Sequence, residues 1–243
     1  MRIKAIITGV ATAHLLASSA SAAIELISNG NFETGTFAGW TTADQGSGNF
    51  SIDAPSTTTP ISGHTTAGSA ANGNFYAVSD QTGGGVHSLR QTFVVPASSS
   101  VVLTFDMFVN DYDSGPIINP AGLTILAGAN QHARVDILGI AAGPFDTGAA
   151  VLGNFYLGVD AGTDPHAFTH YSFDITSLVG AGGTFQLRFA EVDNQGFFNQ
   201  GVDNVSIMAA TVPEPSTYVA GALLLLPFGA QVIRRLSTSK QVS

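Results

Sequence analysis

The sequence has no cysteine and very little positive charge between its two ends. Its 243 residues include no cysteine, so disulfide bonds and cysteine-ligated metals are excluded. Residues 23–211 contain no lysine, and three arginines stand against sixteen acidic residues, which gives a formal charge of −13. A surface of this sign repels phosphate backbones and argues against a nucleic-acid partner. Stability must come from a hydrophobic core, for which a segment of this length is sufficient.

Several catalytic motifs are absent as well. The sequence contains no Gly-x-Ser-x-Gly elbow, no HExxH motif and no P-loop. His166 and His170 have the spacing of a helical metal pair, but the residues around them favour a strand, where that spacing separates them by about 13 Å. A glycoside hydrolase needs two carboxylates, and Glu33 with Glu191 is the nominal pair, although nothing in the sequence places them opposite each other. A polysaccharide-acting hydrolase is therefore the third of three functional hypotheses.

The first 22 residues have the organisation of a secretory signal peptide. Arg2 and Lys4 precede an apolar stretch over residues 5–17. Small residues follow and end in Ala20-Ser21-Ala22, which is an A-x-A cleavage site. We therefore expect residues 1–22 to be removed on export.

The C-terminal segment joins a proline-rich linker to a long apolar run. Pro213-Glu214-Pro215 cannot continue a strand or a helix. Residues 217–233 carry no charge, and their 17 residues are at the short end of the length that crosses a bilayer. Arg234 and Arg235 follow directly, which predicts a cytoplasmic end for this transmembrane helix. The protein is therefore expected to be exported and anchored by its C-terminus.

This order of features resembles, over residues 212–240, the PEP-CTERM sorting tail, in which a Pro-Glu-Pro motif, a spanning helix and basic residues follow one another. In that family the tail marks exported proteins of Gram-negative bacteria that make exopolysaccharide, and an integral-membrane exosortase processes it. The resemblance implies an exosortase as processing partner and an inner-membrane-anchored precursor. It also implies a mature protein at the cell surface or in the extracellular matrix. Pro227 departs from an ideal helix, although membrane helices tolerate such kinks.

Residues 23–211 have the pattern of a single all-β domain. Apolar and polar residues alternate between turns rich in Gly, Ser and Pro, as in half-buried strands. Roughly nine or ten short strands at this spacing favour a two-sheet antiparallel sandwich of jelly-roll type, and residues 174–179 favour one short helical turn. The clearest strands are residues 87–95, 101–109, 184–192 and 201–208, and weaker candidates are 24–28, 50–53, 75–79, 133–138, 155–157 and 167–175.

The two ends of this domain carry a second resemblance. The segment Asn29-Gly30-Asn31-Phe32-Glu33, followed by Trp40, and the closing Asp203-Asn204-Val205 resemble jelly-roll domains of the galactose-binding-like and carbohydrate-binding-module type. In those domains the two segments contribute to a structural calcium site. The resemblance implies Glu33 and Asp203 as carboxylate ligands, with carbonyls near Gly30 and Asn31 completing the oxygen shell that calcium prefers. The alternative is that both carboxylates cap turns by accepting hydrogen bonds from nearby amides.

The last predicted loop combines aromatic and amide side chains. Phe197, Phe198, Asn199 and Gln200 follow a group of acidic and amide residues. Sugars are bound by aromatic faces and by planar amides or carboxylates, so these four residues are candidate ligand-binding residues. If a strand runs through both rings, they point to opposite faces and at most one enters the core. The alternative is that both rings return to the core while the polar residues solvate a hairpin.

Two non-catalytic hypotheses therefore rank above the hydrolase. The first is a surface or extracellular-matrix protein associated with exopolysaccharide. The second is a carbohydrate-binding module with a defined sugar site. Exposure of Trp40, Tyr112, Phe197 or Phe198 in the folded protein would favour the second.

Overall fold

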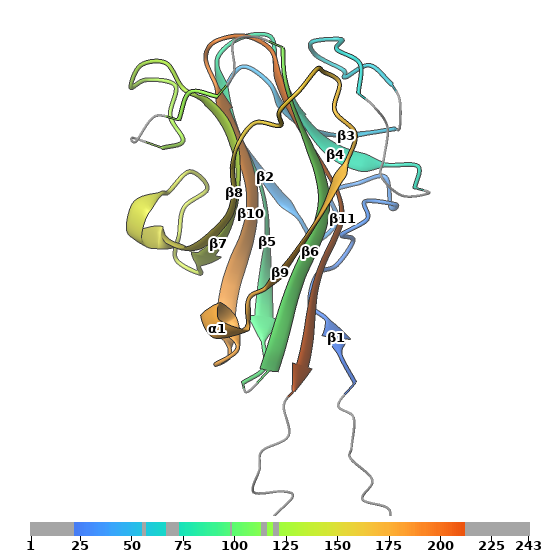
Figure 1. Cartoon of the computed structure of the whole chain (residues 1–243), viewed down its shortest axis with the longest axis vertical. Coiled ribbons are helices and arrows are strands. Elements are labelled where there is room, and N and C mark those ends of the chain that lie inside the picture. Colours follow the sequence, from blue (N-terminus) through green and yellow to red (C-terminus); the bar gives the residue numbers. More distant parts are fainter. Residues whose placement is uncertain are drawn as a thin grey trace, which may run out of the picture.

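Two antiparallel sheets packed face to face form the body of the protein (Figure 1). The first sheet has the strand order β3-β4-β11-β6-β9, with the short β1 also on β11, and the second has the order β2-β5-β10-β7-β8. The two-sheet antiparallel sandwich that the sequence predicts is thus confirmed. The computed structural model describes residues 22–54, 57–66, 73–97, 99–112, 116–118 and 122–211.

The elements have the following bounds. The first sheet consists of β1 (Ile24–Glu25), β3 (Asn49–Asp53), β4 (Tyr76–Asp80), β6 (Ser99–Asp111), β9 (Thr169–Asp174) and β11 (Phe198–Thr211). The second consists of β2 (Thr41–Gly46), β5 (Gly85–Val95), β7 (Gln131–Gly139), β8 (Val151–Gly158) and β10 (Gly183–Asp193), and the two short helical segments are η1 (Gly148–Ala150) and α1 (Thr176–Val179).

The two expected terminal segments fall almost entirely outside this description. Residues 1–21 of the signal peptide and the sorting tail at residues 212–240 lie outside the described residues. Within the described ranges, no helix has the length and hydrophobicity that a bilayer crossing requires.

The hydrophobic core lies between the sheets because the strands alternate. In β10, Leu187 and Phe189 belong to the main buried cluster, while Arg188 between them points to the outer face. Phe189 contacts Phe105 of β6 edge-on, with ring centroids 5.3 Å apart, and so joins the two sheets. Burial of each such side chain contributes roughly 1.5–3 kcal/mol. The alternation predicted over residues 184–192 is confirmed.

The N-terminal segment lies along the last strand, which brings together the two segments that the resemblance assigns to one site. The Leu26 N–H donates to the Ile207 carbonyl at 2.9 Å, and the Val205 N–H donates to the Gly30 carbonyl at 2.9 Å. A Cβ added at Gly30 would lie 1.8 Å from the Val205 carbonyl oxygen. Only glycine permits this approach, so Gly30 brings the two ends of the domain together.

A bulge in β11 changes which residues of that strand face the core. The register with β6 shifts between Asp203 and Ser206, and Asn204 there has a positive φ of 48°. Val202 before the bulge and Val205 after it both lie in the main core cluster. The bulge therefore reverses the inward-facing parity within one strand, which a constant period-two pattern does not predict.

The edge strand β2 is a feature that the sequence does not predict. Its sequence, Thr41 to Gly46, lacks alternating apolar residues, and it becomes a strand by pairing with β5 from Arg90 to Gly85. Tertiary pairing has outweighed weak local preference. The short helical turn expected at residues 174–179 is confirmed by α1.

Candidate functional site

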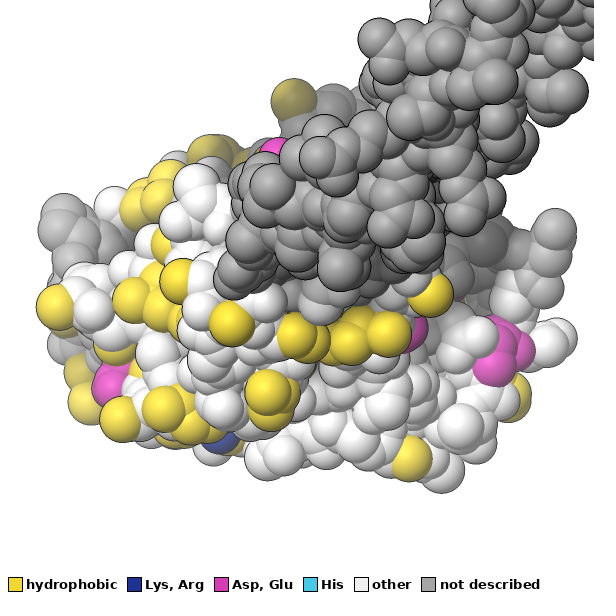
Figure 2. Space-filling model, turned by 90° about the horizontal axis from the view of Figure 1, so that it is seen from below, with side chains coloured by type: hydrophobic (Ala, Val, Ile, Leu, Met, Phe, Trp, Pro, Cys, Tyr) yellow, Lys and Arg dark blue, Asp and Glu magenta, His cyan; other side chains and the backbone are white. Residues whose placement is uncertain are grey.

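The loops that follow β2, β4, β6, β8 and β10 gather at the end of the sandwich away from β1 and from the last residues of β11, and we call this the loop end (Figure 1). Figure 2 shows the opposite end, over which apolar side chains are scattered among few charged ones. The loop end differs in carrying an aromatic stack beside a depression, and it is the candidate site.

His64, Tyr112 and Phe197 form this aromatic stack. The His64 ring contacts the other two, with its centroid 4.1 Å from that of Tyr112 and 4.6 Å from that of Phe197. The Tyr112 N–H donates to the Phe197 carbonyl at 3.1 Å, and its hydroxyl donates to the Thr65 carbonyl at 2.7 Å. Burial raises the pKa of Tyr112 to about 12, so the hydroxyl remains a donor at neutral pH. Phe197 is 39% exposed, so the stack offers aromatic surface on a fixed support.

An open depression of about 200 Å³ lies beside Phe197. Residues 82–84 line one side and residues 194–197 line the other. A Cβ added at Gly84 would lie 3.3 Å from Cβ of Asn194, so a side chain there would crowd the opposite loop. The depression thus presents backbone groups of glycines and the amide of the exposed Gln195 next to an aromatic ring.

Asp193 fixes the turn that carries Phe197. Its carboxylate accepts hydrogen bonds from the N–H groups of Gln195 at 2.7 Å and Gly196 at 3.3 Å. The Gln81 side chain donates to the same carboxylate at 2.8 Å. Burial raises the pKa of Asp193, although these donors oppose the rise. The exposed ring is therefore held on an ordered turn rather than on an unsupported loop.

Of the four candidate ligand-binding residues, only Phe197 presents its side chain at the surface. Phe198 is fully buried in the main core, so the two adjacent rings do point to opposite faces. Asn199 and Gln200 are also fully buried, and the Asn199 side chain donates to the Ser79 carbonyl at 2.9 Å. The interpretation of Phe198, Asn199 and Gln200 as surface ligand-binding residues is therefore corrected, because β11 begins at residue 198 and takes all three into the sandwich.

Buried polar side chains lie between the sheets beneath the loop end, centred on His87 and Glu191. His87 Nδ1 is 2.9 Å from Asp44 Oδ1, and its Nε2 is 2.9 Å from Gln81 Oε1 and 3.7 Å from Glu191 Oε1. Burial lowers the pKa of His87 and raises that of Glu191 well above its ordinary value. The Ser79 hydroxyl opposes this rise, but neither carboxyl oxygen of Glu191 makes a well-formed hydrogen bond within the described residues. Burial therefore favours the protonated, neutral form of Glu191.

Glu33 lies apart from Glu191 in a different environment. Its Oε1 accepts hydrogen bonds from the N–H groups of Asn74 at 2.7 Å and Phe75 at 3.0 Å, and Oε2 accepts one from the Asn74 side chain at 3.1 Å. These donors lower the pKa of Glu33. Glu191 has no exposed surface, so the nominal hydrolase pair does not face a substrate in one cleft.

The buried Asp203 is the second carboxylate of the expected calcium site. It accepts a hydrogen bond from the Asn204 N–H at 2.7 Å. Burial, followed by the negative charges of Asp106 and Glu33, raises the pKa of Asp203 to about 7. Glu33 is thus within electrostatic reach, but its oxygens and the Gly30 carbonyl are already occupied by N–H donors.

Metal binding at this junction has no further support from the geometry. Among the described residues, no three or more His, Asp and Glu side chains are arranged to hold a metal ion. The capping alternative accounts for the hydrogen bonds that both carboxylates make. Calcium coordination by Glu33 and Asp203 stays a prediction.

Comparisons with known proteins identify no family. No protein-family model matches the chain, and no curated protein matches it. TmCBM61, solved with β-1,4-galactotriose, is 8% identical over 76% of this chain and 97% of its own, with a TM-score of 0.46. A cyclase from Fischerella sp. TAU is 19% identical over 79% and 100%, with a TM-score of 0.46. The K1 cleaved adhesin domain of Lys-gingipain from Porphyromonas gingivalis W83 is 15% identical over 79% and 99%, with a TM-score of 0.45. Because the names describe a binding module, an enzyme and an adhesin, this similarity carries no functional argument.

Proposed function

We propose that the protein is an exported, non-catalytic polysaccharide-binding protein of the cell surface or extracellular matrix, and that its loop end contacts the sugar. The observation that carries this proposal is the exposed ring of Phe197, fixed on the aromatic stack beside a glycine-lined depression. Aromatic rings that are exposed on ordered supports are typical of recognition surfaces.

The chemistry of the loop end suits a neutral polysaccharide. A sugar ring would place its C–H face on Phe197 and its hydroxyls on backbone groups of residues 82–84 and on the Gln195 amide. The domain's formal charge of −13 disfavours polyanions. Two acidic residues lie at this end as well, because the Asp111 N–H donates to the Asp164 carboxylate and Asp164 acts electrostatically on Tyr112. Glu33 and Glu191 do not form an exposed carboxylate pair, because Glu191 is fully buried. We therefore propose a binding protein rather than a hydrolase.

The proposal is tested by native affinity electrophoresis of the full-length protein in detergent, through gels containing neutral galactan, glucan or mannan. The wild type is expected to be retarded by at least one of them. Phe197→Ala should weaken this retention by about two- to tenfold, since an aromatic contact of this kind contributes about 0.5–1.5 kcal/mol. Phe197→Leu keeps an apolar side chain without a flat face and should give an intermediate loss.

Ile140→Ala is the matched control. Ile140 is 53% exposed and follows β7 at the end of the sandwich away from the loop end. The Ile140→Ala variant should leave retention unchanged. All three variants should keep the free energy of unfolding within about 1 kcal/mol of the wild-type value. Equal retention of wild type and Phe197→Ala would refute the role of the loop end.

We also propose that the C-terminal tail sorts the protein through an exosortase-type enzyme. Replacing Pro213, Glu214 and Pro215 by alanine should leave export intact but trap a membrane-bound precursor that keeps Arg234 and Arg235. Deletion after Thr211 should release a soluble domain. Continued membrane fractionation of the truncated chain would show that the tail is not its anchor.

A structural calcium ion held by Glu33 and Asp203 is a further part of the proposal. Calcium that binds only the folded form stabilises it by about 2.7 kcal/mol at a hundredfold excess over its dissociation constant. Millimolar calcium should therefore raise the melting temperature of the wild type and leave Asp203→Ala and Glu33→Ala unaffected. Identical wild-type melts in calcium and in chelator would remove this site.

A further inference from the structure

The arginines of the domain lie together on the outer face of the second sheet. Arg90 of β5 pairs in register with Arg188 of β10, which pairs in turn with Asp136 of β7. Arg134 stands two residues before Asp136 on the same face of β7. These are the only basic residues other than histidine in residues 23–211, so all the arginine charge of an acidic domain is on one face.

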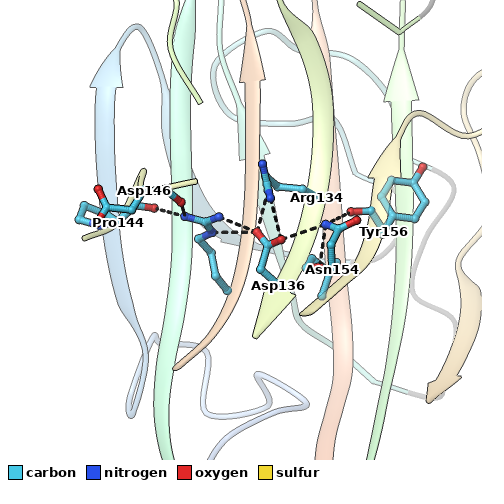
Figure 3. A network of polar contacts seen from close by, with 8 residues as sticks. Arg134, Asp136, Pro144, Asp146, Asn154 and Tyr156 are labelled. Carbon is cyan, nitrogen blue, oxygen red and sulfur yellow. Dashed lines mark hydrogen bonds and ion pairs between the residues drawn. The ribbon is translucent and has the colours of Figure 1, made fainter. Parts of the chain in front are cut away.

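Asp136 is the centre of a hydrogen-bonded network in which both of its carboxylate oxygens accept (Figure 3). Its Oδ2 accepts from Arg134 Nε at 2.7 Å and from Arg188 Nη2 at 2.6 Å and Nε at 3.1 Å. Its Oδ1 accepts from Arg134 Nη2 and Asn154 Nδ2, both at 2.9 Å. Burial raises the pKa of Asp136, but these donors and charges outweigh it and hold the pKa below its usual value. The carboxylate is therefore ionised, and the network of one acid and two arginines carries one net positive charge.

The remaining charges on this face do not cancel that excess. Arg188 also donates through Nη1 to the backbone carbonyls of Pro144 at 3.0 Å and Asp146 at 2.7 Å. The Asp146 carboxylate accepts from the Gly143 N–H at 2.8 Å and acts electrostatically on Arg90. Arg90 and Asp146 thus offset each other, and the net positive charge remains with Arg134, Arg188 and Asp136.

A pocket of about 360 Å³ adjoins this network at Arg134. Its size is at the small end of ligand pockets and matches one sugar ring. The lining contains no acidic residue among those that the structure describes, and its walls combine apolar side chains with glycines and a hydroxyl. The lining residues are Ile118, Gly122, His132, Arg134, Thr147, Gly148, Val151 and Leu157.

Two hydrogen-bond donors of this pocket lack acceptors. Arg134 is fixed by Asp136 through Nε and Nη2, and its Nη1, which is not one of the enclosed unpaired atoms, is left to donate to water or to a ligand. His132 is fully buried, and neither ring nitrogen makes a well-formed hydrogen bond there, although the Ile117 carbonyl lies near the ring. The neutral imidazole of His132 carries one N–H, and a buried donor without a well-formed acceptor is costly. The pocket therefore offers hydrogen-bond donors, and a ligand that fits it should supply acceptors.

We propose that this pocket binds a small carboxylate of the size of one sugar acid, with Arg134 as the principal contact. One net positive charge matches a monoanion, and a guanidinium already fixed in position loses little side-chain entropy on binding. The apolar walls at Val151 and Leu157 would contact the carbon face of the ligand. This site is on a sheet face and is independent of the loop end and of the proposed function.

The test is calorimetric titration of the full-length protein with glucuronate and with glucose at constant ionic strength. Glucuronate should bind at least tenfold more tightly than glucose, because only the acid supplies an anionic acceptor for Arg134. Arg134→Gln should reduce glucuronate affinity at least tenfold. Leu157→Trp fills the pocket while leaving Arg134, Asp136 and Arg188 in the sequence, and it should have the same effect, which covers the case in which Arg134→Gln fails to fold.

Arg90→Gln removes the same charge from the same face outside the pocket and is the matched control, as is Phe197→Ala at the loop end. Both should keep glucuronate affinity within about threefold of the wild type. Retardation in gels containing alginate distinguishes a carboxylate borne by a polymer from a free sugar acid, and binding in either form supports the site. No binding of either form, or equal binding by wild type and Leu157→Trp, would overturn it.

Discussion

Arg188 and Glu191 stand three residues apart on β10, and both are fully buried, but they have opposite surroundings. Arg188 faces outward and donates to Asp136 and to two backbone carbonyls. Glu191 faces inward, 3.7 Å from His87, without a well-formed hydrogen bond to its carboxyl oxygens within the described residues. Burial alone therefore does not decide whether a side chain stays charged. The partners decide, because the outer network holds Asp136 ionised, while burial without such partners favours the protonated form of Glu191.

The largest effect is expected from breaking the outer network. Asp136→Ala leaves Arg134 and Arg188 facing each other without their shared acceptor. Removal of one partner from a buried ion pair typically costs about 3–5 kcal/mol. We expect the free energy of unfolding, measured by urea denaturation at pH 7, to fall by about this amount. A loss below about 1 kcal/mol would contradict the role given to this network.

A smaller effect on stability is expected from a change of pH, because the buried Asp203 has no positively charged partner among the described residues. Asp203 has a pKa of about 7 in the folded protein against 3.8 ordinarily. Between those values the folded state holds a proton that the unfolded state has released, so stability falls as pH rises toward 7. The melting temperature of the wild type should drop between pH 5 and 8 more steeply than that of Asp203→Asn. Parallel pH profiles for the two proteins would show that Asp203 is not the group responsible.

His132 has the opposite effect on stability: its contribution rises with pH over the lower part of this range. Burial, with help from the charge of Arg134, lowers its pKa from 6.5 to about 4. The neutral ring is favoured in the fold, so its contribution is present above pH 6.5 and is lost as pH falls toward 4. His132→Gln should therefore lose less stability than the wild type between pH 6.5 and 4.5. The difference between wild type and each variant separates the two contributions, because Asp203→Asn and His132→Gln shift the profile in opposite directions.

The smallest effect is expected at Glu191. Glutamine has nearly the shape of a protonated glutamic acid, so Glu191→Gln replaces one neutral polar group by another. The free energy of unfolding at pH 7 should change by less than about 1 kcal/mol, in contrast to Asp136→Ala. A loss as large as that of Asp136→Ala would mean that Glu191 is ionised and paired, and the contrast between the two faces of β10 would fail.

Much of the fold was accessible from sequence because it depends on local alternation. The period-two pattern around Leu187 and Phe189 predicts the sandwich and the core. The segments around Gly30 and Val205, which the resemblance assigns to one site, are hydrogen-bonded to each other in the fold. The edge strand β2 could not be predicted, because its residues become a strand only through pairing with β5.

The candidate site was accessible only in part. The adjacent rings of Phe197 and Phe198 predict that one points outward, but not that Asn199 and Gln200 are buried with the other. The aromatic stack joins His64 and Tyr112 to Phe197 over long stretches of sequence, as the outer network joins Arg188 to Asp136 across 52 positions. No local pattern marks such pairs, because sheet topology alone brings them together.

The most direct test of the loop end as the sugar site is amide hydrogen exchange of the full-length protein with and without an oligosaccharide of the retarding polysaccharide. Binding should slow exchange at residues 82–84 and 194–197, which line the depression beside Phe197. The outer face of β7 and β8 should be unaffected. Protection confined to that face, or none at the loop end under saturating ligand, would contradict the proposed site.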